Sequence, residues 1–225
     1  MKIVFIRHGH PNYELDCLTE LGHKQAEAAG ERLKDEHFDL MFASSCGRAY
    51  ETACHVAERH GLEVMKLDFM RELDWGKQGT EDYAHPWMLA DKWIDEGAPL
   101  MDPKWFDSPD YKGRTFLDSY NAACSGFDKW LEQFGLKREG DYYRITEKCD
   151  KTVLLASHAG SSGAILAHLT NIPYPVMIRS MSPTYTAITE AEFPGEVGAL
   201  TTPRFALMND ANHIKGITVN NVFGR

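Results

Sequence analysis

Three short apolar runs along the chain each precede a segment with helical periodicity. The runs predict buried strands, and the segments after them repeat small or apolar residues at intervals of three and four, which predicts helices. The three strand and helix pairs are 2–6 with 19–34, 39–44 with 48–60, and 152–156 with 160–169. Strands that alternate with helices predict a three-layer α/β/α fold, in which right-handed crossovers build a mostly parallel central sheet.

Residues 77–145 depart from this alternation. Aromatic and small side chains recur there at helical spacing, at Phe116, Tyr120, Ala123, Phe127, Trp130 and Phe134. We interpret the segment as a mainly helical insertion, or lid, over the carboxyl ends of the strands, and we expect most of its aromatic side chains to pack a small core of its own. Further strands are predicted at 184–192 and 204–208, so that residues 1–225 form a single domain containing this insertion.

The composition narrows the class of protein. A chain of 225 residues with 43% hydrophobic residues can bury a full core. Its formal net charge of −9 argues against a nucleic-acid partner, because binding to a phosphate backbone depends on clustered lysine and arginine. Any positively charged site must therefore be local.

The start of the chain and the cysteines lead us to expect a cytoplasmic location. The opening apolar run stops at Arg7, which is too early for the apolar region of a signal peptide. No stretch approaches the ~20 apolar residues that a membrane span requires, so we expect no membrane partner. The five cysteines form an odd set without a C-x-x-C pair, which favours reduced thiols over disulfides or a zinc site.

Basic and imidazole side chains follow the carboxyl ends of all three predicted strands. Arg7 and His8 follow the first strand. Arg48 lies just beyond the second strand, and His158 follows the third. Ligands of open parallel sheets bind beyond these strand ends, and helices that begin near Arg48 and Gly160 would point unpaired N–H groups at the same crevice. Because a guanidinium fork matches the oxygens of a phosphoryl group, we predict a phosphate site there.

Five short motifs, in order along the chain, resemble those of a known family. They are Arg7-His8-Gly9, Leu18-Thr19-x-x-Gly22, Ser44-x-x-x-Arg48-Ala49, Arg71-Glu72-Leu73-x-x-Gly76 and Ser157-His158-Ala159-Gly160. Together they resemble the histidine phosphatase, or phosphoglycerate-mutase-like, superfamily, and the fourth resembles the segment that carries the general acid in its larger branch. The resemblance runs from residue 1 to about residue 190. It implies a phosphate-transfer enzyme that needs neither a metal ion nor another cofactor.

The resemblance also implies roles for individual residues. His8 attacks phosphorus, and two neighbouring arginines disfavour its protonation, so that one ring nitrogen stays nucleophilic. Glu72 protonates the leaving oxygen and then activates water. On local sequence alone an exposed loop carboxylate is an equal interpretation of Glu72, and Asp74 is its nearest rival. The expected catalytic set is His8, Glu72, His158, Arg7 and Arg48, and the expected phosphate-binding set is Arg7, His8, Gly9, Arg48, His158 and Ala159.

Three positions differ from the usual pattern of that family. His10-Pro11 stands where many members carry an acidic residue and a hydroxyl residue, and Ala159 replaces a glycine. The segment Asn209-Asp210-x-x-His213 resembles a motif of some phosphatase members, and a structural cap is an equal interpretation of it. Substrate contacts from the loop that contains His10 are therefore not transferred to this chain.

Spacing disfavours two other nucleophiles. Cys46 lies near a helix start, but Arg48 follows it by only two residues, whereas cysteine phosphatases use a C-x5-R loop. Residues 160–163, Gly-Ser-Ser-Gly, are one residue short of the G-x-S-x-G elbow of serine hydrolases. His8 therefore remains the expected nucleophile.

These features predict a phosphomonoesterase that hydrolyses a small intracellular phosphate ester and releases inorganic phosphate. A mutase of the same fold is the first alternative, but eight acidic residues against two lysines over residues 81–111 suit a polyanionic substrate poorly. A protein that docks phosphorylated partners without catalysis is the second alternative. The presence of both His8 and Glu72 argues against it.

Overall fold

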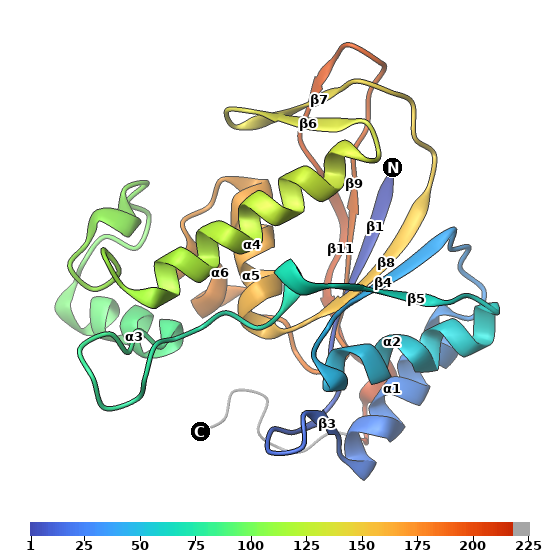
Figure 1. Ribbon diagram of the computed structural model, residues 1–225, viewed down its shortest axis with the longest axis horizontal. Helices are drawn as coiled ribbons and strands as arrows, with labels where there is room; N and C mark the ends of the chain where they lie inside the picture. The colour runs from blue at the N-terminus through green and yellow to red at the C-terminus, as the bar shows by residue number, and fades with distance from the viewer. Residues whose placement is uncertain (218–225) are drawn as a thin grey trace.

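A six-stranded sheet forms the centre of the molecule (Figure 1). The protein's computed structural model describes residues 1–217. In order across the sheet, the strands are β11 (Arg204–Asp210), β9 (Ile188–Glu192), β1 (Lys2–Arg7), β8 (Thr152–Ser157), β4 (Leu40–Ser44) and β5 (Val64–Leu67). Strands β1, β8, β4 and β5 run parallel, whereas β9 is antiparallel to both of its neighbours. The prediction of an α/β fold with a mostly parallel central sheet is confirmed.

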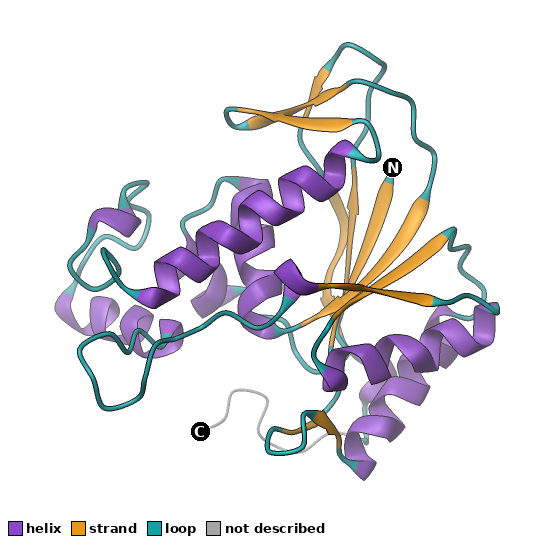
Figure 2. Ribbon diagram, in the orientation of Figure 1, coloured by secondary structure: helices purple, strands orange, loops and turns teal. Residues whose placement is uncertain are grey.

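Helices cover both faces of this sheet (Figure 2). They are α1 (Glu20–Leu33), α2 (Gly47–His60), α3 (Pro86–Glu96), α4 (Thr115–Glu132), α5 (Ala159–Thr170) and α6 (Tyr174–Ser180). Val4 and Ile6 of β1 point into the apolar cluster shared with α1 and α2, and Ile3 and Phe5 point into the cluster shared with α4 and α5. Burial on both faces explains why this strand is apolar along its whole length.

Local sequence signals set the ends of the three predicted helices. The hydroxyl of Thr19 caps α1 by accepting the N–H of Gly22 at 3.1 Å. Helix α2 ends at Gly61 with φ +63°, and α5 ends at Asn171 with φ +55°, the left-handed conformation that closes many helices. Each helix therefore begins and ends within one residue of its predicted bounds.

Helix α4 confirms the aromatic spacing within residues 77–145, but it lies along a face of the sheet rather than over its end. The ring centroids of Phe127 and Phe5 are 6.2 Å apart, and those of Trp130 and Phe42 are 5.2 Å apart. The expectation that these aromatic side chains form a separate small core is wrong, because they share one apolar cluster with the strands. Helix α3 lies farther from the sheet, against α6 (Figure 1).

Several short elements are not predicted by the sequence pattern. The strands are the edge strand β5, the hairpin of β2 (Pro11–Asn12) and β3 (Cys17–Leu18), and a three-stranded antiparallel sheet of β6 (Leu136–Glu139), β7 (Tyr142–Ile145) and β10 (Leu200–Thr201). The short 3₁₀ helices are η1 (Asp68–Met70), η2 (Trp105–Asp107) and η3 (Asn212–Ile214). These strands are two to four residues long and partly exposed, so alternation cannot reveal them.

The position of Phe127 gives a test of this packing. Its side chain is fully buried between α4 and the sheet, so Phe127→Ala should lower the free energy of unfolding by roughly 3–5 kcal/mol through lost burial and a cavity. Met88→Ala is the control, because Met88 is 63% exposed and its loss should change stability by less than about 0.5 kcal/mol. Urea denaturation measures both, and equal effects would contradict the packing of α4 on the sheet.

Candidate active site

The carboxyl ends of three adjacent parallel strands form the base of the candidate site. Strand β1 ends at Arg7, paired with Ser157 at the end of β8, and β4 ends at Ser44 on the far side of β8. His8 and His158 directly follow the first two strands, and their ring centroids are 5.1 Å apart. The fold thus brings together side chains that are far apart in the sequence.

His8 is buried, and one hydrogen bond fixes its tautomer. Its Nδ1 lies 2.7 Å from the carbonyl oxygen of Gly9, so Nδ1 carries the proton and donates it. Burial lowers the pKa of His8 well below its usual value, and the charges of Arg7 and Arg48 lower this pKa further. The ring is therefore neutral, and Nε2 retains the lone pair that a nucleophile needs.

Arg7 is held by a loop from the C-terminal part of the chain. Its Nη1 donates a hydrogen bond to the carbonyl oxygen of Pro183 at 2.8 Å, and its guanidinium carbon lies 4.2 Å from the centroid of the Tyr185 ring. Its Nε is buried and has no hydrogen-bond partner within residues 1–217. This buried N–H therefore lacks a compensating acceptor in the described part of the chain, which is energetically costly.

Arg48, in the first turn of α2, is held by Asp16 in the loop between β2 and β3. One carboxylate oxygen of Asp16 accepts a hydrogen bond from Nη1 of Arg48, and the other accepts the N–H of Gly47 at 2.8 Å. The Nε of Arg48 is also buried without a partner in the described part of the chain. Asp16 therefore orients the guanidinium fork of Arg48.

His158 lies at the start of α5 and is fully buried. Its Nε2 lies 2.8 Å from the hydroxyl oxygen of Ser44, and its Nδ1 has no partner among the described residues. Burial lowers the pKa of His158 well below its usual value, and the nearby His8 and arginines act in the same direction. A neutral ring can donate through only one of its nitrogens, so the hydroxyl of Ser44 helps to decide which nitrogen faces a ligand.

Glu72 follows η1, and its carboxylate contacts the first turn of α5. The carboxylate oxygens accept the N–H groups of Ser161 at 2.9 Å and Gly160 at 3.3 Å. Burial raises the pKa of Glu72, although these hydrogen bonds and the charge of Arg7 oppose that rise. Its rival Asp74 is exposed and accepts the N–H of Gly76 at 2.9 Å, which is a local turn contact.

The two small residues of the predicted phosphate-binding set differ in their surroundings. The N–H of Gly9 donates to the hydroxyl of Thr52 at 3.1 Å, and a Cβ on Gly9 would lie 2.6 Å from the carbonyl oxygen of Gly22. Gly9 therefore permits α1 to approach the end of β1, while its part in phosphate binding stays a prediction. Ala159 is the first residue of α5 and is buried beside His158.

Comparison with known proteins identifies the family. A model of the histidine phosphatase superfamily (branch 1) matches residues 3–204. The chain belongs to this superfamily. The resemblance stated from its motifs is therefore confirmed, and both arginines and both histidines lie at the base of a histidine phosphatase fold.

The similar proteins include phosphatases and a mutase. Phosphoserine phosphatase 1 of Hydrogenobacter thermophilus is 35% identical over 139 residues, which cover 56% of this chain and 62% of that relative, less than two thirds of its length. A 2,3-bisphosphoglycerate-dependent phosphoglycerate mutase of Brucella canis is 26% identical over 186 residues, which cover 76% of this chain and 82% of that relative. A mycobacterial glucosyl-3-phosphoglycerate phosphatase, solved with inorganic phosphate, is 25% identical in sequence. Its structure matches with a TM-score of 0.65 over 95% of this chain and 99% of that chain. These likenesses support a phosphatase or mutase enzyme.

The residues that support the two arginines are not evident from the sequence. Asp16 and Tyr185 lie in short loops without any periodic pattern, so no local signal marks them as partners of Arg48 and Arg7. The segment Asn209-Asp210-x-x-His213 was singled out, and the structure gives it a supporting position. Its Asn209 side chain binds the loop before Tyr185 by accepting the N–H of Thr184 at 2.8 Å.

His213 completes this support. Its Nε2 lies 3.0 Å from the hydroxyl oxygen of Thr186, directly after Tyr185. Asn209 also donates to the carbonyl oxygen of Ser182 at 3.2 Å. The motif thus holds residues 182–186 against Arg7, as a structural support for the site.

The remaining candidates have local partners. The N–H of His10 donates to Gln25 at 2.7 Å, and its ring lies 2.9 Å from the hydroxyl of Thr19, so His10 is bound to the start of α1. The thiol of Cys46 is buried at the cap of α2. Ser161 donates its hydroxyl to the carbonyl oxygen of Met70 at 3.2 Å. The hydrogen bonds of His10 and Ser161 favour structural roles for these two side chains, although the ring of His10 also lies 5.6 Å from that of Tyr185.

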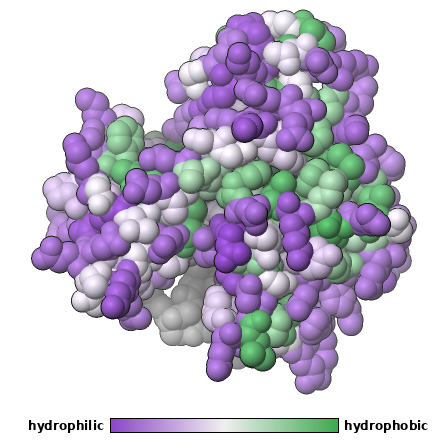
Figure 3. Space-filling view, viewed as in Figure 1, coloured by the Kyte–Doolittle hydropathy of each residue, from purple (hydrophilic) through white to green (hydrophobic). Residues whose placement is uncertain are grey.

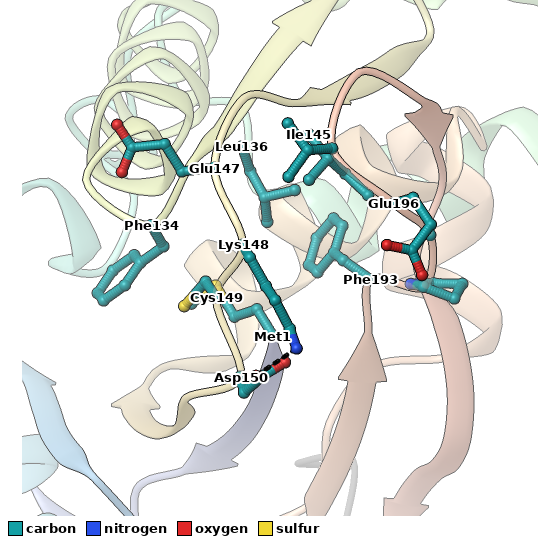
Figure 4. Close-up of a pocket in the computed structure, with 13 residues that line it drawn as sticks. Met1, Phe134, Leu136, Ile145, Glu147, Lys148, Cys149, Asp150, Phe193 and Glu196 are labelled. Carbon is teal, nitrogen blue, oxygen red and sulfur yellow. Dashed lines mark ion pairs between the residues drawn. The ribbon is translucent and has the colours of Figure 1, made fainter.

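A cavity of about 350 Å³ lies at the opposite, amino end of the sheet (Figure 4). Its walls combine apolar side chains such as Leu136 and Phe193 with charged ones, of which three are acidic and the amine of Lys148 is paired with Asp150. This cavity therefore offers no cluster of free cations to a phosphate. Within residues 1–217 no group of three or more His, Cys, Asp or Glu side chains could hold a metal ion, and no helix is long and apolar enough to cross a membrane.

The lowered pKa of His8 gives a test of the site. Because a lowered pKa leaves imidazole neutral, the ring nitrogens of His8 should keep the chemical shifts of the neutral form, with the proton on Nδ1, down to pH 6 and below. A ¹⁵N NMR titration of the free enzyme measures this, and His8→Ala assigns the signals. A midpoint at pH 6.5 or above would contradict the buried, neutral ring.

Proposed function

We propose that this histidine phosphatase is a metal-independent phosphomonoesterase that acts on a small phosphorylated metabolite through a phosphohistidine on His8. One observation carries the proposal. The neutral ring of His8, with Nε2 unoccupied, lies beside two arginines at the strand ends, and a carboxyl group with a raised pKa lies on the neighbouring α5 turn. Two-step phosphoryl transfer requires a nucleophile, cations that contact the phosphoryl oxygens, and a proton donor.

In the first step, the lone pair of His8 Nε2 forms a bond to phosphorus while the bond from phosphorus to the ester oxygen breaks. The leaving oxygen takes the proton of Glu72, so that an alcohol departs and a carboxylate remains. Arg7, Arg48 and His158 donate hydrogen bonds to the phosphoryl oxygens as charge develops there. The proton stays on His8 Nδ1 throughout, and its hydrogen bond to the Gly9 carbonyl oxygen stabilises the positively charged ring.

In the second step, water attacks the phosphohistidine. The Glu72 carboxylate takes a proton from that water, the new bond from oxygen to phosphorus forms, and the bond from phosphorus to Nε2 breaks. The products are inorganic phosphate, neutral His8 and protonated Glu72, which restores the starting state. Ala159 at the start of α5, together with Gly9, completes the proposed phosphate-binding set.

The likenesses support a small substrate and leave a mutase as the second candidate. The phosphatases among the similar proteins include a phosphoserine phosphatase and a glucosyl-3-phosphoglycerate phosphatase. The mutase relative favours the second candidate. The acidic surface of residues 81–111 argues against a polyanion, and Figure 3 shows mostly hydrophilic residues around α3. Interconversion of 3- and 2-phosphoglycerate would identify a mutase.

We propose a cytoplasmic location and a single domain over residues 1–225, with residues 77–145 as an insertion beside the site. The five cysteines are unpaired, which supports a reducing compartment. The insertion contributes α3 and α4, and α4 belongs to the common apolar cluster, which supports one domain.

Glu72→Gln tests the role of the proposed acid. An alkyl phosphate leaves as a strongly basic alkoxide, so the loss of this proton donor should slow its first step by about 10²–10⁴-fold, whereas a nitrophenyl phosphate needs little protonation. Single-turnover formation of phosphoenzyme measures this step for both esters. Asp74→Asn is the matched control and should leave the ratio of the two rates unchanged. Equal losses for both esters in Glu72→Gln would remove Glu72 from the acid role.

Removal of divalent ions tests the proposed independence from metals. Since arginines supply the positive charge at the strand ends, hydrolysis of phosphate esters should continue at an unchanged rate in excess EDTA. Initial rates with and without the chelator provide the measurement. A loss of turnover that added Mg²⁺ restores would contradict the mechanism, and His8→Ala, which should form no phosphoenzyme, sets the background rate.

A further inference from the structure

We propose that Trp75 is a positioning residue for Glu72, whose indole closes the side of the carboxyl group that would otherwise face water. This inference rests on the proposed function, because it concerns the residue to which we assign the acid role. Residues 77–145 then have a role besides packing on the sheet, because this segment holds the indole in place.

The geometry around Gly160 carries the proposal. A Cβ built on Gly160 would lie 2.2 Å from Cη2 of Trp75 and 2.6 Å from Oε1 of Glu72. The edge of the indole and the carboxylate oxygen therefore meet over the same point of the first α5 turn. The same turn donates the N–H groups of Gly160 and Ser161 to the carboxylate. Backbone donors and an apolar ring thus enclose Glu72 together.

The insertion fixes the indole of Trp75. Its ring stacks on Phe116 of α4, with centroids 5.7 Å apart and an interplanar angle of 25°, and it meets the edge of Trp87 at 6.0 Å. Its carbonyl oxygen accepts the N–H of Ala84 at 2.7 Å, which closes the intervening loop. The turn between them needs glycine at position 76, where φ is +77° and a Cβ would lie 2.5 Å from the Asp82 carbonyl oxygen.

The other groups that face Glu72 cannot explain a protonated carboxyl group. Arg7 from β1 favours the carboxylate form, while Tyr13 from the β2–β3 loop and Tyr174 from α6 carry no charge at neutral pH. On its own segment, Arg71 donates to Ser45 at 3.3 Å and Asp74 accepts from Gly76. Burial is the largest influence on the pKa of Glu72, and it raises that pKa.

Loss of the indole should lower the pKa of Glu72 and so change the pH dependence of turnover. Replacement of the indole by a smaller side chain admits water to Glu72, which stabilises the carboxylate and lowers its pKa toward the ordinary value. The protonated fraction at neutral pH then falls. For an alkyl ester, the alkaline limb of the kcat/KM profile should move to lower pH, while rates at the acidic end of the profile change little.

The experiment compares Trp75→Leu and Trp75→Phe with Trp87→Leu, a control that removes an indole from the same aromatic group. We expect Trp75→Leu to move the alkaline limb for an alkyl phosphate down by about one pH unit, which corresponds to about tenfold slower turnover above that limb. Trp75→Phe should move it less in the same direction, and Trp87→Leu, which removes a supporting ring but keeps the Trp75 indole against Glu72, should also move it much less than Trp75→Leu. The first step with a nitrophenyl phosphate should change much less than with the alkyl ester.

A ¹³C NMR titration of the Glu72 carboxyl group, assigned with Glu72→Gln, measures the same shift without turnover and applies to Trp75→Phe if Trp75→Leu does not fold. An unchanged alkaline limb and an unchanged Glu72 titration in both Trp75 variants, with Glu72→Gln still selective for the alkyl ester, would overturn the inference alone. A shift as large in Trp87→Leu would also overturn it. Loss of the selectivity of Glu72→Gln would instead refute the proposed function.

Discussion

The burial of an uncharged imidazole beside two guanidinium groups is the constraint on which the rest of the site depends. His8 stays neutral because its ring is removed from water and because protonation would add a third positive charge to the end of the sheet. The Gly9 carbonyl then fixes the tautomer and leaves Nε2 unoccupied. Replacement of either arginine would weaken both the proposed anion site and the electrostatic reason for the neutral ring of His8.

The arginines themselves need support, and loops far apart in the chain provide it. Asp16 binds Arg48 from the β2–β3 loop, whereas Tyr185 and the Pro183 carbonyl hold Arg7 from a loop near the C-terminus. Asn209 fixes that second loop in turn. Each guanidinium is oriented through some of its N–H groups, and its buried Nε has no partner in residues 1–217.

Burial acts on the proposed acid in the same way. It raises the pKa of the Glu72 carboxyl group, against which the apolar edge of Trp75 lies, although the backbone N–H groups of the first α5 turn and the charge of Arg7 oppose that rise. Burial also lowers the pKa of the His8 imidazole, and the nearby arginines lower it further. Removal from water therefore shifts the two pKa values in opposite directions. In our proposal, residues 77–145 act on the pKa of Glu72 by holding the indole of Trp75 in place through Phe116.

The sequence by itself determined the strand and helix pairs and the positions of Arg7, His8, Arg48, Glu72 and His158, because apolar runs and helix caps are local signals and the motifs are contiguous. It did not determine that Ser44 contacts His158, that Asp16 pairs with Arg48, or that Trp75 lies against Glu72. The first two contacts join segments far apart in the chain and depend on strand order, whereas Trp75 and Glu72 are near neighbours in sequence that both lie against Gly160 of α5. Only the tertiary structure could decide them, because periodicity describes which face of an element is buried and not which distant side chain meets it.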